Sequence, residues 1–240
     1  MNEMNSGQYP VHFLALPTHQ LLTRFGSGGH KPGSGSAAAL LSLISSKLLQ
    51  TVVSLSKNRD DYREVENQLT LVNQNIIDSI EPFLIEAVQR DAVQFDKVIA
   101  LRRARDAETD PRRKRRLREK ARMELRSATE IPLEIAQHSV KLAQQALTVF
   151  DLGFKSARGD SGVAVSAALS GATGALCIVF LNLASFGKSD WAIDMRIKAN
   201  GLQASIQSLH VALLQRVNGL QSEAEARAER VEDSTQAVVK

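Results

Sequence analysis

The chain has 240 residues, 30 of them Lys or Arg and 26 Asp or Glu, so its net charge is +4. Aromatic residues make up only 5%, and 14 glycines with 6 prolines are too few turn-formers for a β-sandwich, barrel or propeller. A hydrophobic fraction of 43% excludes a wholly disordered chain, and one cysteine, Cys177, excludes a disulfide scaffold. The first twenty residues lack a basic stretch followed by an apolar core, so we expect a cytoplasmic protein.

The N-terminal part of the chain predicts an arm followed by a buried helix. Residues 1–20 are polar and contain Pro10 and Pro17, and we expect them to form a loose arm. Five glycines lie between positions 26 and 35, and they open a helix that Ser34 or Ser36 could cap. From 37 to 53 the residues are mostly small or aliphatic, which predicts a helix buried on most sides.

Two longer helices are predicted next. Apolar residues from 65 to 104 recur at steps of three and four, which indicates a helix starting near Arg59 and interrupted at Pro82. A further helix begins at Pro111 after an Asp110 cap, continues through a kink or break at Pro132, and stops at Gly153.

The fourth predicted helix, from 160 to 187, has no charged residue after Asp160. A bilayer span is one reading, but its Ser, Thr, Gly and Asn residues favour a central bundle helix, so we expect no membrane partner. A fifth helix runs from 189 to 231, and residues 232–240 are expected to fray. The prediction is an all-α domain over residues 21–231 with about five long helices. Two helices without a charged face also suggest a symmetric homodimer.

The positive charge is concentrated between Arg102 and Arg126, where 12 basic residues face 5 acidic ones. Their local charge is +7, which leaves −3 for the rest of the chain. Such a segment could bind nucleic acid, but no aromatic residue for base stacking lies between Phe95 and Phe150. We therefore expect a solvated helical hairpin or a rim for an anionic ligand, and we do not expect nucleic acid as a partner.

Few residues are candidates for catalysis. The five histidines show no metal-ligand spacing, and we expect neither a metal nor a cofactor; His30 alone stands out, because it lies in the glycine-rich loop. Asp91 lies one turn from the apolar Val88 and Phe95, so it can sit at the edge of a buried face with a raised pKa and act as a general acid. Pairing with an arginine is the alternative role. Asp160 is a candidate helix cap.

Five segments together resemble the cyclodeaminase/cyclohydrolase family of folate enzymes. The stretch from Lys31 to Leu40, KPGSGSAAAL, is similar to the family's PGGGS-x-AAL opening, and residues 91–98 are similar to its DAxAF segment. Residues 128–136 resemble AT-x-VPLE-x-A, and residues 159–164 resemble SD-x-GVA. The last segment, with Gly174, Ala175, Asn182 and Leu183, resembles GA-x-x-NV-x-x-NL.

The resemblance implies a dimeric all-α enzyme that opens or closes the one-carbon ring of tetrahydrofolate. It implies a methenyltetrahydrofolate cyclohydrolase or a formimidoyltetrahydrofolate cyclodeaminase, with Asp91 as the catalytic proton donor and a folate as the substrate. The implied substrate-binding residues are Lys31, Pro32, Gly33, Ser34, Gly35, Ser36, Phe95, Asp160 and Asn182.

The chain departs from the family pattern at several places. Ser34 replaces the middle glycine of the loop, Gly159 replaces the serine before Asp160, and Ile178 stands where an asparagine is usual. Arg102 and Arg103 replace a Leu-Pro pair. Two alternatives therefore stay open: an inactive folate- or ligand-binding regulatory protein on the same scaffold, and a nucleic-acid-binding helical protein that uses the hairpin of residues 102–126.

Overall fold

The computed structural model describes residues 12–57 and 59–238, and within these ranges it contains helices and no strand. Five helices in the described part exceed 20 residues: α2 (Ser34–Ser56), α4 (Glu81–Ala107), α5 (Pro111–Leu152), α6 (Arg158–Leu183) and α7 (Asp190–Val238). Two shorter helices, α1 (Thr18–Phe25) and α3 (Glu66–Asn75), lie at one edge and one end of the bundle. The all-α prediction is confirmed.

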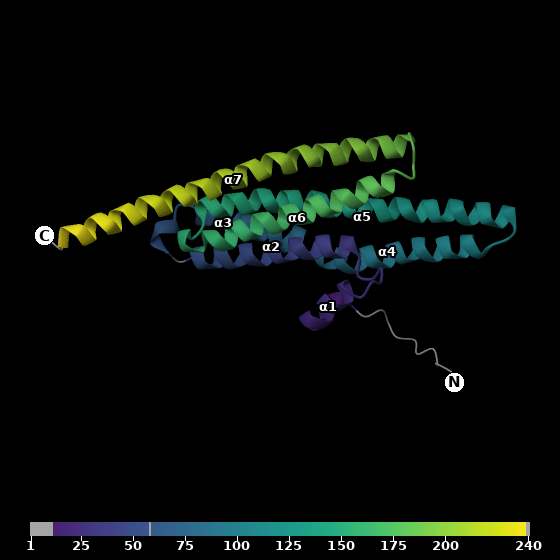
Figure 1. Cartoon of the computed structure of the whole chain (residues 1–240), viewed down its shortest axis with the longest axis horizontal. Helices are drawn as coiled ribbons and strands as arrows, with labels where there is room; N and C mark the ends of the chain where they lie inside the picture. Colours follow the sequence, from purple (N-terminus) through teal and green to yellow (C-terminus); the bar gives the residue numbers. More distant parts are fainter. Residues whose placement is uncertain (1–11, 58, 239–240) are drawn as a thin grey trace.

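Helix α6 lies at the centre of the bundle and packs against α2, α5 and α7 (Figure 1). Close approach between α6 and α2 depends on Gly171. A Cβ atom at this position would lie 2.7 Å from the carbonyl oxygen of Ala38 and 2.3 Å from Oγ of Ser42. Because both atoms belong to α2, only glycine permits this helix spacing. The α4–α5 hairpin projects beyond the other helices at the end opposite the C-terminus of α7 (Figure 1).

The ends of α5 follow the predicted signals. The carboxylate of Asp110 accepts a hydrogen bond of 2.8 Å from the backbone N–H of Arg112, Pro111 is the first helical residue, and Gly153 follows the last. At Pro132, where the sequence predicts a continuing helix with a kink or a break, α5 continues without a break. Proline has no N–H for the carbonyl of Ala128, and Nδ2 of Asn182 on α6 donates to that oxygen at 3.1 Å instead. A side chain from another helix thus satisfies the carbonyl that Pro132 leaves free.

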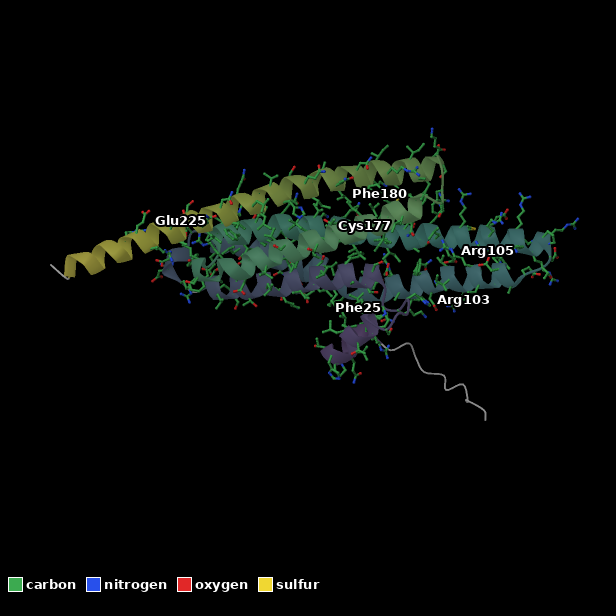
Figure 2. All side chains as sticks on the ribbon, in the orientation of Figure 1. Phe25, Arg103, Arg105, Cys177, Phe180 and Glu225 are labelled. Carbon is green, nitrogen blue, oxygen red and sulfur yellow. The ribbon has the colours of Figure 1, made fainter. Side chains whose placement is uncertain are left out.

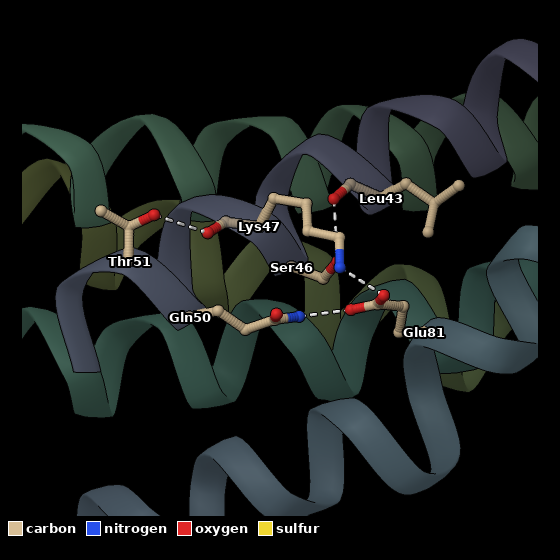
Figure 3. Close-up of polar contacts among 6 residues, drawn as sticks. All are labelled: Leu43, Ser46, Lys47, Gln50, Thr51 and Glu81. Atoms are coloured by element: carbon tan, nitrogen blue, oxygen red, sulfur yellow. Dashed lines mark hydrogen bonds and ion pairs between the residues drawn. The ribbon is translucent and has the colours of Figure 1, made fainter. Parts of the chain in front are cut away.

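The helix predicted from residue 59 to 104, with an interruption at Pro82, is divided in the structure. A short 3₁₀ turn (Asp60–Tyr62) precedes α3, and a π-helical turn (Ile76–Ile80) joins α3 to α4. Pro82 lies two residues after this turn, and its missing N–H cannot serve an ordinary helical bond across it. Glu81 fixes the junction, because its carboxylate accepts hydrogen bonds from Lys47 and Gln50 of α2 (Figure 3).

The expectation of a loose arm does not fit residues 12–20. The 3₁₀ turn Phe13–Ala15 packs on the bundle, where Phe13 is 5% exposed and its N–H donates to Oε1 of Gln89 at 3.1 Å. Helix α1 then begins at Thr18. Residues 1–11 of the arm lie outside the described part. At the other end, the α7 backbone remains helical to Val238, through most of the tail predicted to fray, and residues 239–240 lie outside the described part.

Helix α2 and the segment Lys155–Leu183 are long and apolar enough to cross a membrane by length and composition alone, and half of each apolar window is buried inside the bundle. The parts of these two segments that stay exposed are mostly apolar and carry few charged residues. Their large exposed side chains include Leu41 and Ile44 of α2 and Val163, Phe180 and Leu181 of α6. Cys177 and Phe180 lie along the C-terminal half of α6 (Figure 2). We define these exposed parts of α2 and α6 as the α2–α6 face.

Candidate functional site

Asp91 is the most perturbed acidic group among the described residues. It lies on α4, is 8% exposed, and meets the first turn of α2. Burial raises its pKa to about 6, and a backbone hydrogen bond from Ser36 opposes this rise. The cause is desolvation, because a carboxylate removed from water favours its protonated form. Asp91 can therefore hold and release a proton near neutral pH.

Two residues of α2 build the space around Asp91. A Cβ atom on Gly35 would lie 2.2 Å from Oδ1 of Asp91, so the carboxylate occupies the volume that this glycine leaves open. Ser36 is fully buried, and its hydroxyl donates to the carbonyl oxygen of Val88 at 2.7 Å. The glycine-rich sequence thus fixes the α2–α4 spacing at the carboxylate.

A cleft of about 360 Å³ opens beside Asp91. Apolar side chains of Phe95, Ile178 and Leu181 form much of its wall, which suits a flat aromatic ligand. The glycine-rich loop supplies backbone and one hydroxyl. The complete lining consists of Gly29, His30, Gly33, Ser34, Gly35, Asp91, Phe95, Ile178, Leu181 and Asn182.

Most of the site residues predicted from the sequence meet at this cleft. Gly33, Ser34, Gly35, Phe95 and Asn182 line it with Asp91, although they come from three separate stretches of the chain. Three others have different surroundings. Pro32 and Ser36 are buried in the fold, and Lys31 pairs with Asp96 at 2.5 Å beside the cleft.

Asp160 is the exception among the predicted site residues. It is exposed in the first turn of α6, whereas Asn182 lies at the last turn of the same helix. Their separation of 22 positions corresponds to about 33 Å of helix, so the two cannot line one cleft within one chain. Its predicted capping role is also wrong, because α6 begins at Arg158 and its cap, Ala157, is without a side-chain hydrogen bond.

His30 is a cleft residue that the predicted set of binding residues omitted. Its Nε2 lies 2.9 Å from Oδ1 of Asp96, and Nζ of Lys31 lies 2.5 Å from Oδ2 of the same carboxylate. These two contacts lower the pKa of Asp96. The glycine-rich setting of His30 was the only sequence signal, since no local pattern pairs residue 30 with residue 96.

A second pocket, of about 230 Å³, lies farther along α4 and α5. Four arginines line it together with Ala121, Leu125 and Ser185: Arg102, Arg105, Arg118 and Arg122. No acidic residue is part of the lining, although Asp106 binds Arg105 at 2.8 Å from outside. We call this the arginine pocket; Figure 2 shows Arg105 on the α4–α5 hairpin.

In the part of the chain that the structure describes, no three His, Cys, Asp or Glu residues form a group that could hold a metal ion. The expectation that no metal or cofactor is needed stays a prediction.

Comparison with known proteins relates this chain and its fold to folate enzymes. Residues 17–201 match the family described as formiminotransferase-cyclodeaminase. Over 191 residues the chain is 26% identical to the methenyltetrahydrofolate cyclohydrolase of Methylorubrum extorquens, covering 80% of this chain and 90% of that protein. The fold is similar to the formiminotetrahydrofolate cyclodeaminase of Thermotoga maritima, with a TM-score of 0.75 and 15% identity over 86% of this chain and 98% of that one.

Proposed function

Because the chain belongs to the formiminotransferase-cyclodeaminase family, we propose that its cleft binds a one-carbon derivative of tetrahydrofolate and that Asp91 acts there as the general acid. The reaction is either the hydrolysis of the methenyl bridge or the ring closure that releases ammonia. The observation that carries the proposal is a buried carboxyl group with a pKa of about 6 in a cleft with apolar walls.

The geometry supports each part of this chemistry. A folate presents a flat bicyclic ring and a second aromatic ring, which match the apolar surfaces of Phe95, Ile178 and Leu181. Both reactions break a bond between carbon and nitrogen, and the departing nitrogen needs a proton. Asp91 is protonated in a useful fraction of molecules near its pKa of about 6. As a carboxylate, it also stabilises the cationic methenyl group.

Two turnover measurements test the proposal. The purified protein is expected to change the absorbance of methenyltetrahydrofolate faster than buffer alone, or to release ammonia from formimidoyltetrahydrofolate. If both folates remain unchanged, the enzymatic proposal is wrong. Binding without turnover is the second candidate function, which Ile178 favours because it places an apolar side chain where the family usually has an amide. Thermal stabilisation by the folate without turnover would identify that function.

We propose a homodimer in the cytoplasm, assembled through the α2–α6 face. Half of α6 is buried by its own chain, and the exposed middle of the helix carries the small residues Ser170 and Thr173. Small, uncharged residues there allow two copies of α6 to pack closely. An antiparallel arrangement about this middle would bring Asp160 of one copy to the Asn182 end of the other. This arrangement would reunite the two predicted site residues that one chain separates.

A charge in the middle of the face is expected to separate the dimer. Thr173→Arg places a guanidinium in the proposed interface, where burying an unpaired charge is costly. Sedimentation analysis is expected to give the mass of two chains for the wild type and of one chain for the variant. Ser127→Arg, at an exposed position of α5, is the control and should leave the mass unchanged. A monomeric wild type, or a dimeric Thr173→Arg variant, would contradict the proposal.

The arginine pocket is suited to the carboxylates of a folate's glutamate tail. Arg102 follows Asp91 by 11 residues on α4, which corresponds to a distance of about 16 Å along the helix. This distance leaves room for the aromatic spacer of a folate and one amino acid between the two residues. Within the segment that the sequence predicts as a possible rim, the basic residues are densest at Arg112, Arg113, Arg115 and Arg116. Those residues are exposed in the first turns of α5, at the tip of the hairpin and farther from the cleft.

Neutralising the pocket is expected to weaken the binding of long tails selectively. Arg102→Gln with Arg118→Gln should raise KM for a triglutamate substrate about tenfold more than for the monoglutamate, since charge-assisted bonds to carboxylates contribute roughly 1.5–3 kcal/mol each. The matched control, Arg112→Gln with Arg116→Gln, removes two charges at the hairpin tip. Equal effects of the two double variants would mean that the segment acts only as a solvated cationic surface.

A further inference from the structure

A hydrolysis or a ring closure requires a group that removes a proton from the nucleophile, in addition to the acid that protonates the departing nitrogen. Asp91 supplies the acid under the proposed function. Among the ten residues that line the cleft, His30 is the only other one with a basic side chain, an imidazole that can accept a proton from a nucleophile. The remaining eight are three glycines, three apolar residues, one serine and one asparagine.

The His30 ring is held in one orientation by the hydrogen bond of 2.9 Å between its Nε2 and Oδ1 of Asp96. The pKa of Asp96 is lowered by hydrogen bonds from His30 and from Lys31, so this carboxyl group remains ionised and acts as an acceptor. An ionised carboxylate requires a proton on Nε2. In the neutral ring, Nδ1 then carries the free electron pair that a base needs.

Asp96 also connects this pair to the acid. It lies on α4, five residues after Asp91 and one after the cleft residue Phe95. The same helix therefore positions the acid directly and the histidine through Asp96. The loop that carries His30 is fixed on its other side, because Gly35, five residues later, packs on the Asp91 carboxylate.

From this arrangement we propose that His30 is the general base of the cleft and that Asp96 is its positioning residue. This inference rests on the proposed function. In the hydrolysis, water forms a bond to the methenyl carbon as one of its protons passes to Nδ1 of His30. The bond from carbon to one ring nitrogen then breaks, and its electron pair takes the proton of Asp91.

The remaining hydroxyl proton returns to Asp91 as the formyl C=O bond forms, and His30 releases its proton to solvent. One water is consumed, and one proton is released for each cationic substrate. In the deamination, the formimidoyl group reacts in its protonated, cationic form. The folate's second amine nitrogen, which lies outside the ring system, bonds to the one-carbon group as its proton passes to His30. Asp91 then protonates the amino group, which leaves as ammonia when its bond to carbon breaks. The proton then passes from His30 back to Asp91 through solvent, so the reaction releases only ammonia.

The test compares His30→Gln with Asp96→Asn, using the full chain and whichever folate the wild type converts. Loss of the base is expected to lower kcat by about 10²–10⁴-fold with little change in KM. Imidazole added to the buffer should restore part of that rate. Asp96→Asn, which leaves the imidazole without its orienting carboxylate, should lower kcat less. His19→Gln, at an exposed position of α1 outside the cleft, is the control and should be unaffected.

The variant Lys31→Met distinguishes a catalytic role of His30 from a role in holding the loop on α4. Lys31 binds the same carboxylate as His30, that of Asp96. If the pair only holds the loop on α4, His30→Gln and Lys31→Met should change kcat and KM alike, and imidazole should restore nothing. Either result overturns the proposal, as does an unchanged kcat in His30→Gln. A wild type that converts neither folate would instead overturn the proposed function, so the two failures can be told apart.

Discussion

Replacing Asp91 with asparagine is expected to lower folate turnover by about 10²–10⁴-fold, the contribution typical of a positioned general acid. The amide keeps the shape of the side chain but has no proton to give to the departing nitrogen. The wild-type rate should also bend near pH 6, because only the protonated carboxyl group acts as the acid. Initial rates between pH 5 and pH 8 would reveal the bend, and Asp61→Asn, an exposed residue outside the cleft, serves as the control.

The same substitution is expected to stabilise the fold above pH 6. The pKa of Asp91 is about 6 in the folded protein and 3.8 as the ordinary value, so the folded state binds more protons than the unfolded state between these limits. Stability therefore falls as the pH rises through this window. The cost at pH 8 is on the order of 3 kcal/mol as an upper bound, since one unit of pKa corresponds to about 1.4 kcal/mol.

Urea unfolding at two pH values measures this difference. Asp91→Asn should be more stable than the wild type at pH 8, and the difference should shrink near pH 4, where the wild-type carboxyl is protonated in the folded state. A variant that is inactive and also less stable at pH 8 would contradict the view that burial of the charge is a cost. It would indicate instead that the carboxylate holds α2 and α4 together.

Gly35→Ala is expected to impair activity without unfolding the protein. The new methyl carbon would lie 2.2 Å from Oδ1 and 2.3 Å from Cγ of Asp91, so the carboxylate must move. The carboxylate is the free end of the Asp91 side chain, so it can rotate away while the backbone of α2 and α4 stays in place. A displacement of about 1 Å at a reacting group can lower a rate about 10²-fold. We therefore expect a comparable fall in kcat with a nearly unchanged midpoint of thermal unfolding.

Gly171→Ala is the matched substitution and should have the opposite profile. Its methyl carbon would lie 2.7 Å from a backbone oxygen of Ala38, which cannot rotate away, so α2 and α6 must separate. Overpacking of this kind costs about 1–3 kcal/mol. Chemical denaturation and turnover should be measured for both variants. If Gly35→Ala loses stability as much as Gly171→Ala while retaining its rate, the glycine serves helix packing and not the position of Asp91.

The sequence predicted the helix ends and the buried helix faces that depend on local chemistry. Asp110, Pro111 and Gly153 mark the limits of α5 because a cap, a proline at the first position and a terminal glycine act within a few residues. The sequence predicts the continuation through Pro132, but the contact that satisfies the free carbonyl of Ala128 cannot be read from local signals. It depends on Asn182, which is 54 residues away from Ala128 and donates to the carbonyl that the proline leaves free.

The residues of the cleft also divide into those that the sequence predicted and those that depend on contacts between distant parts of the chain. Periodicity placed Asp91 at the edge of a buried face, and its burial and raised pKa agree with that expectation. The position of Asp160 depends on the length of α6, and the resemblance of a short motif carried no information about that distance. The role of His30 depends on Asp96, 66 residues away, and the arginine pocket depends on which arginines two antiparallel helices bring together.

The sequence by itself therefore determined an all-α chain, the residues that can exchange a proton, and a family whose motifs occur in order. These properties follow from local periodicity and residue chemistry, which act over one or two helical turns. Only the tertiary structure decided which groups share the cleft, how burial raises the pKa of Asp91, and which apolar face stays exposed. Desolvation and hydrogen bonding between helices are set by neighbours distant in the chain, and those neighbours exist only once the helices have packed.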